Sequence, residues 1–325
     1  MKLFVFLCFS QALICAFVCG HHGGPHDDDH DHDGHHHNNE PEALLQISSA
    51  NLKFSYKLYY QLAAAHPNDN FFFSPLSIST AFSLLSLGAK SKTLSQIHEG
   101  FGFNKSLVSE EMIHKGFQKL LNIINQPKSG FELDSANALF IDTKLNLLNK
   151  FLDDAKKFYR SEAISTDFHK VQEALEQINS YVEKKTNGKI KDLLDNLDPM
   201  TALVIVNTIF FKGKEEERKR LNSRHFHELN ERGRDPGNTL SNVEHTREDD
   251  FHVDENTVVK VPMMSRRGEY LTGYIPEIGC RVVDVPYKGN TSAIFVLPEI
   301  GKLHDAEKAL QNLSEEAWNK AMKSR

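Results

Sequence analysis

The 325-residue sequence predicts an α+β protein with large sheets. Apolar residues at helical spacing alternate along the chain with β-branched and aromatic runs that are typical of buried strands. These segments follow one another without the strict strand–helix–strand rhythm of a parallel sheet. Hydrophobic residues make up 40% of the chain and charged residues 25%, so a polytopic membrane protein, a collagen-like fibre and a wholly disordered chain are excluded.

The first helix is predicted from residue 43 to 65, where apolar side chains recur on one face. Ser74 and Pro75 are typical of an N-cap followed by proline at the first helical position, and Gly88 is expected to cap the end of this second helix. The second helix is apolar nearly all round, so we expect it to be deeply buried.

The later elements follow from the same two patterns. Residues 202–211 (ALVIVNTIFF) are a continuous apolar run, which indicates a strand covered on both faces. Asn207 lies inside this run, and a buried amide has to be hydrogen-bonded, so we expect it to belong to a polar network. Further strands are predicted at 137–141, 258–263 and 292–297, and further helices at 151–159 and, amphipathic and lying on a flat surface, at 171–182.

Residues 1–20 have the organisation of a secretory signal peptide. Lys2 precedes an apolar run that is short for a membrane span, and no cluster of Lys or Arg follows it. Val18 and Gly20 are small enough for the positions that flank a cleavage site. We therefore expect the leader to be removed and the protein to be secreted into the extracellular space, without a membrane anchor.

Three of the four cysteines lie in this leader, so only Cys280 would remain. An intramolecular disulfide is then excluded, although the extracellular compartment is oxidising. Two interpretations of Cys280 stay open: a partly buried thiol, or a mixed disulfide with another molecule.

Residues 21–42 form an acidic tail that holds eight His, five Asp and two Glu, but neither Lys nor Arg. Without apolar side chains the segment cannot offset the entropy cost of ordering, so it is expected to be disordered. Dense neutral imidazoles bind Cu, Ni and Zn, and because the spacing of a closed zinc site is missing, we expect loose binding. The alternative is a merely solubilising tail. The candidate ligands are His21, His22, His26, His30, His32, His35, His36 and His37.

The charge of the remaining chain is balanced. Once Lys2 and the seven acidic residues of the tail are set aside, totals of 38 basic and 44 acidic residues become 37 of each. A nucleic-acid-binding protein needs a net basic face, so this class of partner is not expected.

The search for catalytic motifs is negative. The sequence contains no G-x-S-x-G elbow, P-loop, H-E-x-x-H or C-x-x-C pattern. The protein is therefore not expected to be an enzyme, and a secreted binding or inhibitory protein is favoured.

Several segments together resemble the serpin family, and within it the α1-antitrypsin group of secreted plasma serpins. The resemblance is clearest at Phe71–Thr93 (FFFSPLSISTAFSLLSLGAKSKT), Leu203–Lys214 (LVIVNTIFFKGK) and Asp249–Met264 (DDFHVDENTVVKVPMM). It also includes IHKGFQKLLNIINQP and INSYVEKKTNGKIKDLL, and it covers most of residues 43–325. The resemblance implies a serpin domain over 43–325, with helices around three β-sheets.

The resemblance further implies suicide inhibition of an extracellular serine protease by a monomer that requires no cofactor. The protease cleaves a reactive loop, forms an acyl bond with it and is trapped when the loop inserts into the central sheet. By position, Ser74, Pro75 and Ser77 match the shutter beneath the sheet opening, with Asn207 as their polar partner. The helix at 171–182 matches the one that lies across this sheet.

Two departures from the family pattern affect these expectations. The family has a Trp after FKGK, whereas Glu215 follows Lys214 here and begins a charged insertion that extends to Arg234. The sequence also ends at Arg325, before the expected C-terminal part and reactive loop, so the serpin fold is expected to be incomplete at the C-terminus. We therefore expect the full-length form to inhibit a protease and this chain not to do so itself.

Two other functions stay open: a non-inhibitory serpin that carries a small ligand, and a metal-binding plasma protein that acts through the tail. Three N-x-S/T sequons, at Asn104, Asn290 and Asn312, are candidate glycosylation sites in a secreted protein.

Overall fold

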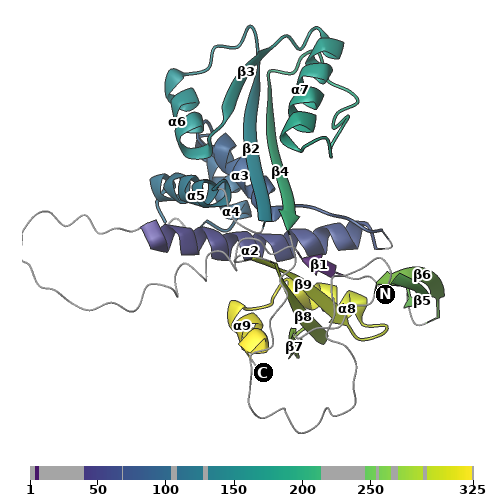
Figure 1. The fold of residues 1–325 in the computed structure, drawn as a ribbon. Helices are drawn as coiled ribbons and strands as arrows, with labels where there is room; N and C mark the ends of the chain where they lie inside the picture. Colours follow the sequence, from purple (N-terminus) through teal and green to yellow (C-terminus); the bar gives the residue numbers. More distant parts are fainter. Residues whose placement is uncertain are drawn as a thin grey trace, which may run out of the picture. The chain divides into compact units, whose positions relative to one another are not determined.

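The computed structural model describes residues 4–6, 40–67, 69–103, 108–126, 131–213, 246–253, 256–264, 270–287 and 291–323. The elements fall into two compact units, and each is described by itself. Figure 1 shows their labels along the chain. None of the helices in these ranges is both long and apolar enough to cross a membrane.

The first unit contains six helices and three strands in the described residues. They are α2 (Glu40–Ala65), α3 (Pro75–Ser86), α4 (Ser91–Gly100), α5 (Glu110–Ile124), β2 (Phe131–Asp142), α6 (Asn149–Tyr159), β3 (Glu162–Thr166), α7 (Val171–Lys185) and β4 (Leu203–Gly213).

The sheet of this unit has the order β3-β2-β4, with β2 parallel to β3 and antiparallel to β4. Side chains of β4 alternate between two apolar clusters. Ile205 and Ile209 pack against a large cluster formed with α2 to α6, while Val204 and Val206 belong to a smaller cluster beneath α7. The prediction that residues 202–211 form a strand covered on both faces is thus confirmed.

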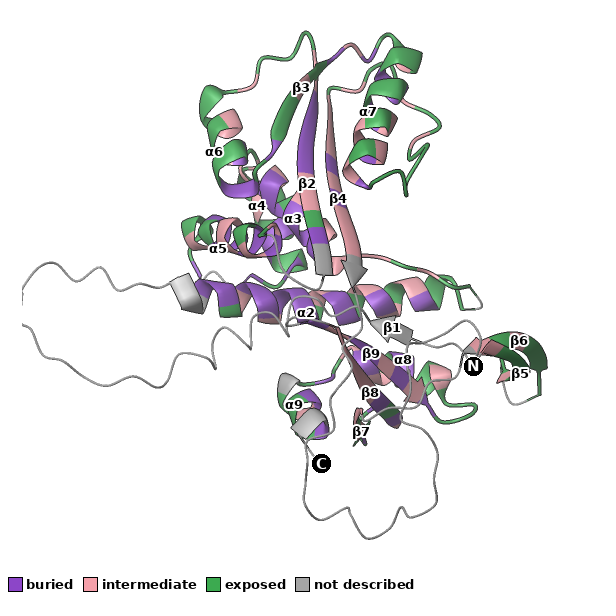
Figure 2. Cartoon of the chain, in the orientation of Figure 1, coloured by how far each residue is buried: buried purple, intermediate pink, exposed green. Residues whose placement is uncertain are grey.

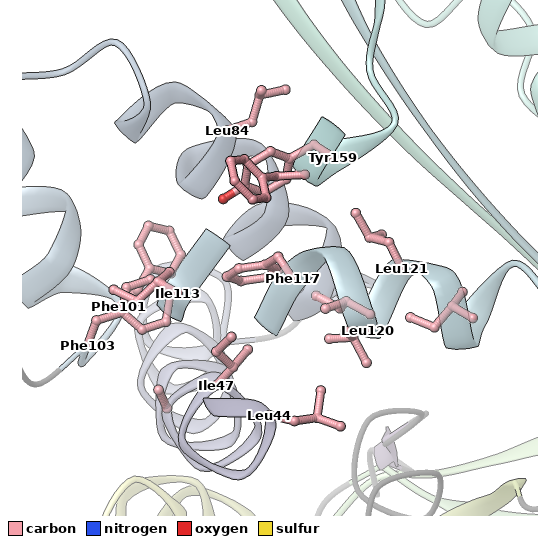
Figure 3. Packing of buried hydrophobic residues seen from close by; sticks show 14 of the residues in the cluster. Leu44, Ile47, Leu84, Phe101, Phe103, Ile113, Phe117, Leu120, Leu121 and Tyr159 are labelled. Atoms are coloured by element: carbon pink, nitrogen blue, oxygen red, sulfur yellow. The ribbon is translucent and has the colours of Figure 1, made fainter. Parts of the chain in front are cut away.

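The large cluster holds the helices of the first unit together. Figure 3 shows Leu44 and Ile47 of α2 against Phe117 and Leu120 of α5, with Tyr159 of α6 nearby. These side chains are almost completely buried. Figure 2 shows α2 largely buried along its length, while α5 carries both buried and exposed positions. The periodicity that predicts the helix at 43–65 therefore marks its packing face.

Helix α7 covers the other face of the sheet. Its buried side chains, Ala174, Leu175, Ile178 and Val182, lie on one side of the helix, and all but Leu175 belong to the smaller cluster with Phe140 of β2. The prediction of an amphipathic helix on a flat surface is confirmed.

Helix α3 agrees with its predicted start but not with its predicted end. The Ser74 side chain accepts a hydrogen bond from the Ser77 amide at 3.2 Å, as expected for an N-cap. The C-cap is Leu87 instead of Gly88, and Gly88 does not adopt the left-handed conformation that favours glycine. The helix is also less apolar inside than predicted, because most of its buried residues carry hydroxyls and Phe82 is 44% exposed.

Two boundaries near the N-terminus differ from the sequence prediction. Helix α2 begins at Glu40, three residues inside the predicted tail, because proline is tolerated in the first turn of a helix. Strand β1 (Phe4–Phe6) lies in the predicted leader and pairs antiparallel with residues 294–296. Residues 7–39, with all eight candidate histidine ligands, lie outside the described residues.

The second unit contains the remaining strands and two helices. Its four-stranded sheet has the order β1-β9-β8-β7, and β5 pairs with β6 in a separate two-stranded ladder. Together with β3-β2-β4, the described residues form three sheets. The elements are β5 (Thr246–His252), β6 (Val258–Met264), β7 (Leu271–Ile275), β8 (Cys280–Tyr287), β9 (Thr291–Pro298), α8 (Leu303–Leu310) and α9 (Glu315–Lys323).

Helix α9 packs closely on β7 at Gly273. A side chain at this position would overlap the carbonyl oxygen of Ala321, so only glycine fits here. Cys280, at the start of β8, is 1% exposed, and burial raises the pKa of its thiol to about 11. A buried thiol of this kind is inert, so the structure favours the buried-thiol interpretation over the mixed disulfide.

Candidate functional site

The candidate site begins with two asparagines that face each other across β2 and β4. Asn137 and Asn207 are direct register partners in the antiparallel ladder. The Asn207 side-chain amide donates to the Asn137 side-chain carbonyl at 2.6 Å. The prediction that Asn207 belongs to a polar network is confirmed.

Asn137 connects this pair to helix α6. Its side-chain amide donates to the backbone carbonyl of Tyr159, the last residue of α6, at 2.8 Å. Asn137 is 2% exposed, so both of its side-chain bonds are made out of contact with water. Such bonds hold the end of α6 to the middle of the sheet, since a broken one would leave buried polar groups unpaired.

Tyr181 connects the opposite face of the sheet to helix α7. Its hydroxyl lies 3.3 Å from the Asn137 backbone carbonyl and 3.4 Å from a carboxylate oxygen of Glu162 on β3. Lys185, one turn further along α7, pairs with the same carboxylate at 2.8 Å. Burial, with a contribution from the Glu162 charge, raises the pKa of Tyr181, so its hydroxyl stays protonated as a donor.

The predicted shutter residues of α3 are not bonded to Asn207 in the described part of the chain. Ser74 is used as the cap of α3, Pro75 occupies the first helical position, and the Ser77 hydroxyl is buried without a hydrogen-bond partner there. The Asn207 side-chain oxygen is also buried without a partner among these residues. Among the described residues Asn207 is bonded to Asn137, a contact that the sequence did not predict, and the shutter assignment itself stays a prediction.

A signal for Asn137 was present in the sequence. Like Asn207, it is an amide inside an apolar strand, directly before Ala138, Leu139 and Phe140. Tyr181 and Glu162 carried no such signal, because their roles depend on how α7 lies on the sheet.

The network suits mechanical coupling between helices and sheet rather than catalysis. Its members are amides, a protonated phenol and one ion pair, and it lacks a nucleophile beside a general base. Within the described ranges, no group of three or more His, Cys, Asp or Glu could hold a metal ion.

Of the three sequons, the structure describes only that at Asn312. This residue is exposed in the turn between α8 and α9, while Asn104 and Asn290 lie outside the described residues. The Ser314 hydroxyl of the sequon accepts a hydrogen bond from the Ala317 amide at the start of α9.

Comparison with known proteins identifies the family. The family model for serpins, described as serine protease inhibitors, matches residues 49–235 and 240–325. The chain belongs to the serpin family. The resemblance inferred from the sequence is thus confirmed. Because serpins are a family of protease inhibitors and not of enzymes, the expectation that the chain is not an enzyme is confirmed as well. The match includes the charged insertion, residues 215–234, which lies outside the described residues.

The relatives of this serpin include α1-antitrypsin-like proteins. It is 43% identical to the α1-antitrypsin-like protein GS55-MS of Ictidomys tridecemlineatus over 289 residues. This alignment covers 89% of this chain and 64% of that protein. It is 42% identical to the plasma serine protease inhibitor of Homo sapiens, over 85% of this chain and 63% of that protein. The chain thus spans less than two thirds of the length of these relatives.

Solved structures confirm the serpin fold. Cleaved kallistatin complexed with heparin superimposes with a TM-score of 0.75 at 37% identity, over 87% of this chain and 76% of that one. Reactive-loop-cleaved human thyroxine-binding globulin gives a TM-score of 0.74 at 36% identity, over 85% and 75% of the two chains.

Proposed function

We propose that this serpin, in its full-length secreted form, inhibits an extracellular serine protease by inserting a cleaved reactive loop beside β4. The edge of β4 that faces away from β2 carries no strand in the described part of the chain. An edge strand presents a row of backbone donors and acceptors, which is the template for adding another strand. This open edge is the single observation that supports the proposal most directly.

The polar network fits this role. The Asn137–Asn207 bond fixes the strand next to the open edge, and Tyr181 fixes the helix that covers the sheet. Membership of a family of serine protease inhibitors, with a plasma serine protease inhibitor among the relatives, supports the choice of target class. The apolar leader supports secretion, and the exposed sequon at Asn312 supports glycosylation.

The test is incubation with trypsin-like and elastase-like proteases, followed by denaturing electrophoresis. The longest form expressed from the same gene and the 325-residue chain are tested side by side. An SDS-stable adduct with the mass of the protease plus the part of the inhibitor that precedes the cleaved bond supports the proposal, because the C-terminal fragment is released as the leaving group. The same protease with its active-site serine blocked is the control, because it cannot form the acyl bond. Cleavage of the longest form by every protease without an adduct would reject inhibition and favour a carrier.

A carrier of a small ligand is the second candidate, because solved structures of thyroxine-binding globulin, one of them complexed with a thyroxine conjugate, resemble this chain. Titration of thyroxine and of a fluorescent thyroxine conjugate into the longest form, followed by fluorescence, tests this function. Saturable binding without any protease adduct would favour it over inhibition.

Metal binding by the tail is the third candidate, favoured by eight histidines between residues 21 and 37. Calorimetry with Cu, Ni and Zn salts compares the chain that starts at His21 with one that starts at Glu40, which keeps helix α2 whole. We expect binding to be lost in the shorter chain. Equal binding by the two would exclude the tail as the site.

A further inference from the structure

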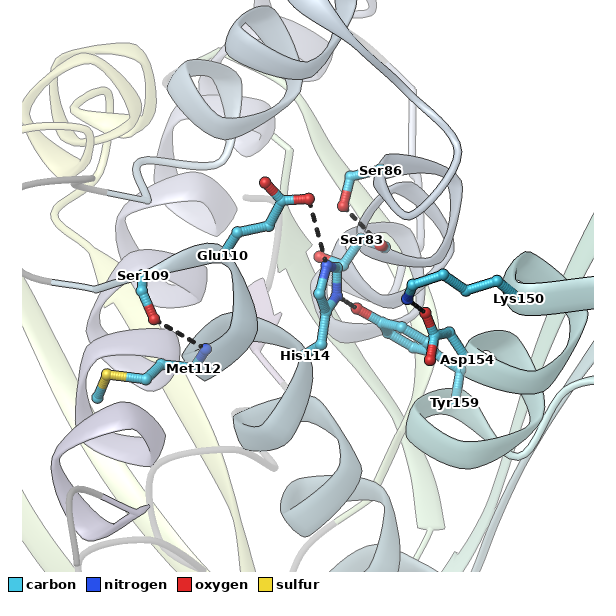
Figure 4. A network of polar contacts seen from close by, with 9 residues as sticks. All are labelled: Ser83, Ser86, Ser109, Glu110, Met112, His114, Lys150, Asp154 and Tyr159. Atoms are coloured by element: carbon cyan, nitrogen blue, oxygen red, sulfur yellow. Dashed lines mark hydrogen bonds and ion pairs between the residues drawn. The ribbon is translucent and has the colours of Figure 1, made fainter. Parts of the chain in front are cut away.

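A buried histidine, His114, lies where helices α4, α5 and α6 meet. Figure 4 shows its ring between α5 and the end of α6. The Nδ1 atom lies 2.6 Å from the hydroxyl of Tyr159, which is completely buried. The rings of Phe158 and Tyr159 flank the imidazole, each with its centroid 5.8 Å away. The imidazole is thus enclosed by apolar and phenolic groups, which solvate a positive charge poorly.

A second buried histidine, His98, lies on α4. It is 2% exposed, and its ring packs against Phe103 with the centroids 6.1 Å apart. The two imidazoles are near enough that a charge on His98 opposes a charge on His114. Two positive charges in this junction would therefore repel each other in a medium that screens them weakly.

The other charged groups around His114 do not cancel this cost. On α5, a carboxylate oxygen of Glu110 lies 3.9 Å from Nε2, but this side chain is half-exposed. On α6, Asp154 favours the charged imidazole and Lys150 opposes it, and these two side chains pair with each other. The two residues that α3 contributes in Figure 4, Ser83 and Ser86, are uncharged.

Burial, with a smaller contribution from His98, lowers the pKa of His114 to about 4. In an open junction the imidazole would regain its ordinary pKa near 6.5. The closed junction, in which His114 is buried, is therefore most stable above a pH of about 6.5. It loses stability as the pH falls toward about 4, because the open junction, in which the imidazole meets water, binds the proton more tightly.

We propose that the junction of α4, α5 and α6 is an acid-opened joint, in which protonation of His114 beside His98 separates these helices locally while the sheet stays folded. The joint is distinct from the proposed inhibitory function, since it lies in the helical cluster and not at the β4 edge. From the lowered pKa of His114 alone, the open population is expected to rise about twentyfold between pH 7 and pH 5.

Hydrogen–deuterium exchange of the full chain, corrected for the intrinsic effect of pH, tests the joint. The protection factors of peptides from α4, α5 and α6 are expected to fall about twentyfold between pH 7 and pH 5. The protection factors of peptides from β2 and β4 are expected to stay unchanged. Exchange at the imidazole C2 carbon in the same samples reports the titration of each histidine. Unchanged protection in the three helices, or titration of His114 near pH 6.5, would overturn the proposal.

Substitutions separate the joint from general acid instability. His98→Leu with His114→Asn removes both imidazoles of the junction, and the asparagine can still reach the Tyr159 hydroxyl. We expect less than a threefold change in protection in this variant. The matched control is His66→Asn, which removes an exposed histidine of the same unit and should leave the twentyfold loss intact. If the double variant is as acid-sensitive as the parent chain, the proposal is wrong.

Single variants keep the test decisive should the double variant fail to fold. His98→Leu alone is expected to reduce the acid-induced loss without abolishing it. Tyr159→Phe, which keeps both imidazoles, should lower protection at pH 7 and remain acid-sensitive. Acid sensitivity that survives unchanged in His98→Leu would remove the second imidazole from the proposal.

Discussion

Asn137 and Asn207 are register partners on neighbouring strands, and their side chains are hydrogen-bonded to each other at 2.6 Å. The two residues are not equivalent, because Asn137 also donates to the Tyr159 carbonyl. It is therefore the centre of the network, and Asn207 is one of its branches.

This asymmetry predicts unequal costs of substitution. Asn137→Ala leaves the Tyr159 carbonyl and the Asn207 amide without partners, and we expect it to lower the free energy of unfolding by about 2–4 kcal/mol. Asn207→Ala breaks one bond and should cost about 1–2 kcal/mol. Urea denaturation followed by circular dichroism measures both. Equal costs for the two substitutions would contradict the central position of Asn137.

A second prediction concerns the close approach of α2 and α5 at Gly116. A methyl group added here would overlap the side chain of Ile47, which is 1% exposed and has little room to move. Gly116→Ala should therefore destabilise the chain by about 1–3 kcal/mol. Gly100→Ala is the matched control, since it is also helical and an added methyl would meet open space. This control should be neutral or stabilising by up to about 1 kcal/mol. If both variants are stabilised, the packing described for α5 is wrong.

The third prediction uses the only tryptophan of the chain. Trp318 is buried on α9, which packs on β7 where Gly273 faces the Ala321 carbonyl. Gly273→Ala should push α9 away, because a backbone oxygen cannot escape by changing rotamer. We expect the fluorescence emission of Trp318 to shift to the red in native buffer. An unshifted spectrum with unchanged stability would show that α9 accommodates the methyl group.

The fourth prediction concerns the reactivity of Cys280. With a thiol pKa of about 11, the thiolate fraction at pH 8 is on the order of 0.1%, and the side chain is buried as well. Iodoacetamide at pH 8 should leave Cys280 unmodified in the native chain and modify it in urea, as measured by peptide mass mapping. Labelling at equal rates in both conditions would restore the mixed-disulfide interpretation.

Much of the first unit could be predicted from local pattern. The Ser74-Pro75 start, the amphipathic face of α7 and the apolar run of β4 each reflect a strong local preference, and the structure agrees with all three. The predicted end of α3 is wrong, because Leu87 and not Gly88 holds the C-cap position, and it does so in a helical conformation.

The site was harder to predict than the fold. Asn207 could be recognised as a buried amide, but its partner lies 70 residues earlier and is set by the register of β2 and β4. Likewise, the contact between Tyr181 and Glu162 depends on where α7 crosses the sheet. Long-range pairings of this kind leave no periodic trace in the sequence. The family resemblance pointed to Asn207, but it placed this residue with the start of α3 and gave no role to Asn137.

Strand β1 lies in the segment that the sequence predicts to be a cleaved signal peptide. Its residues Phe4–Phe6 pair with the edge of β9 at residues 294–296. The predicted cleavage would remove this partner and leave the backbone of residues 294–296 open to pairing with another strand.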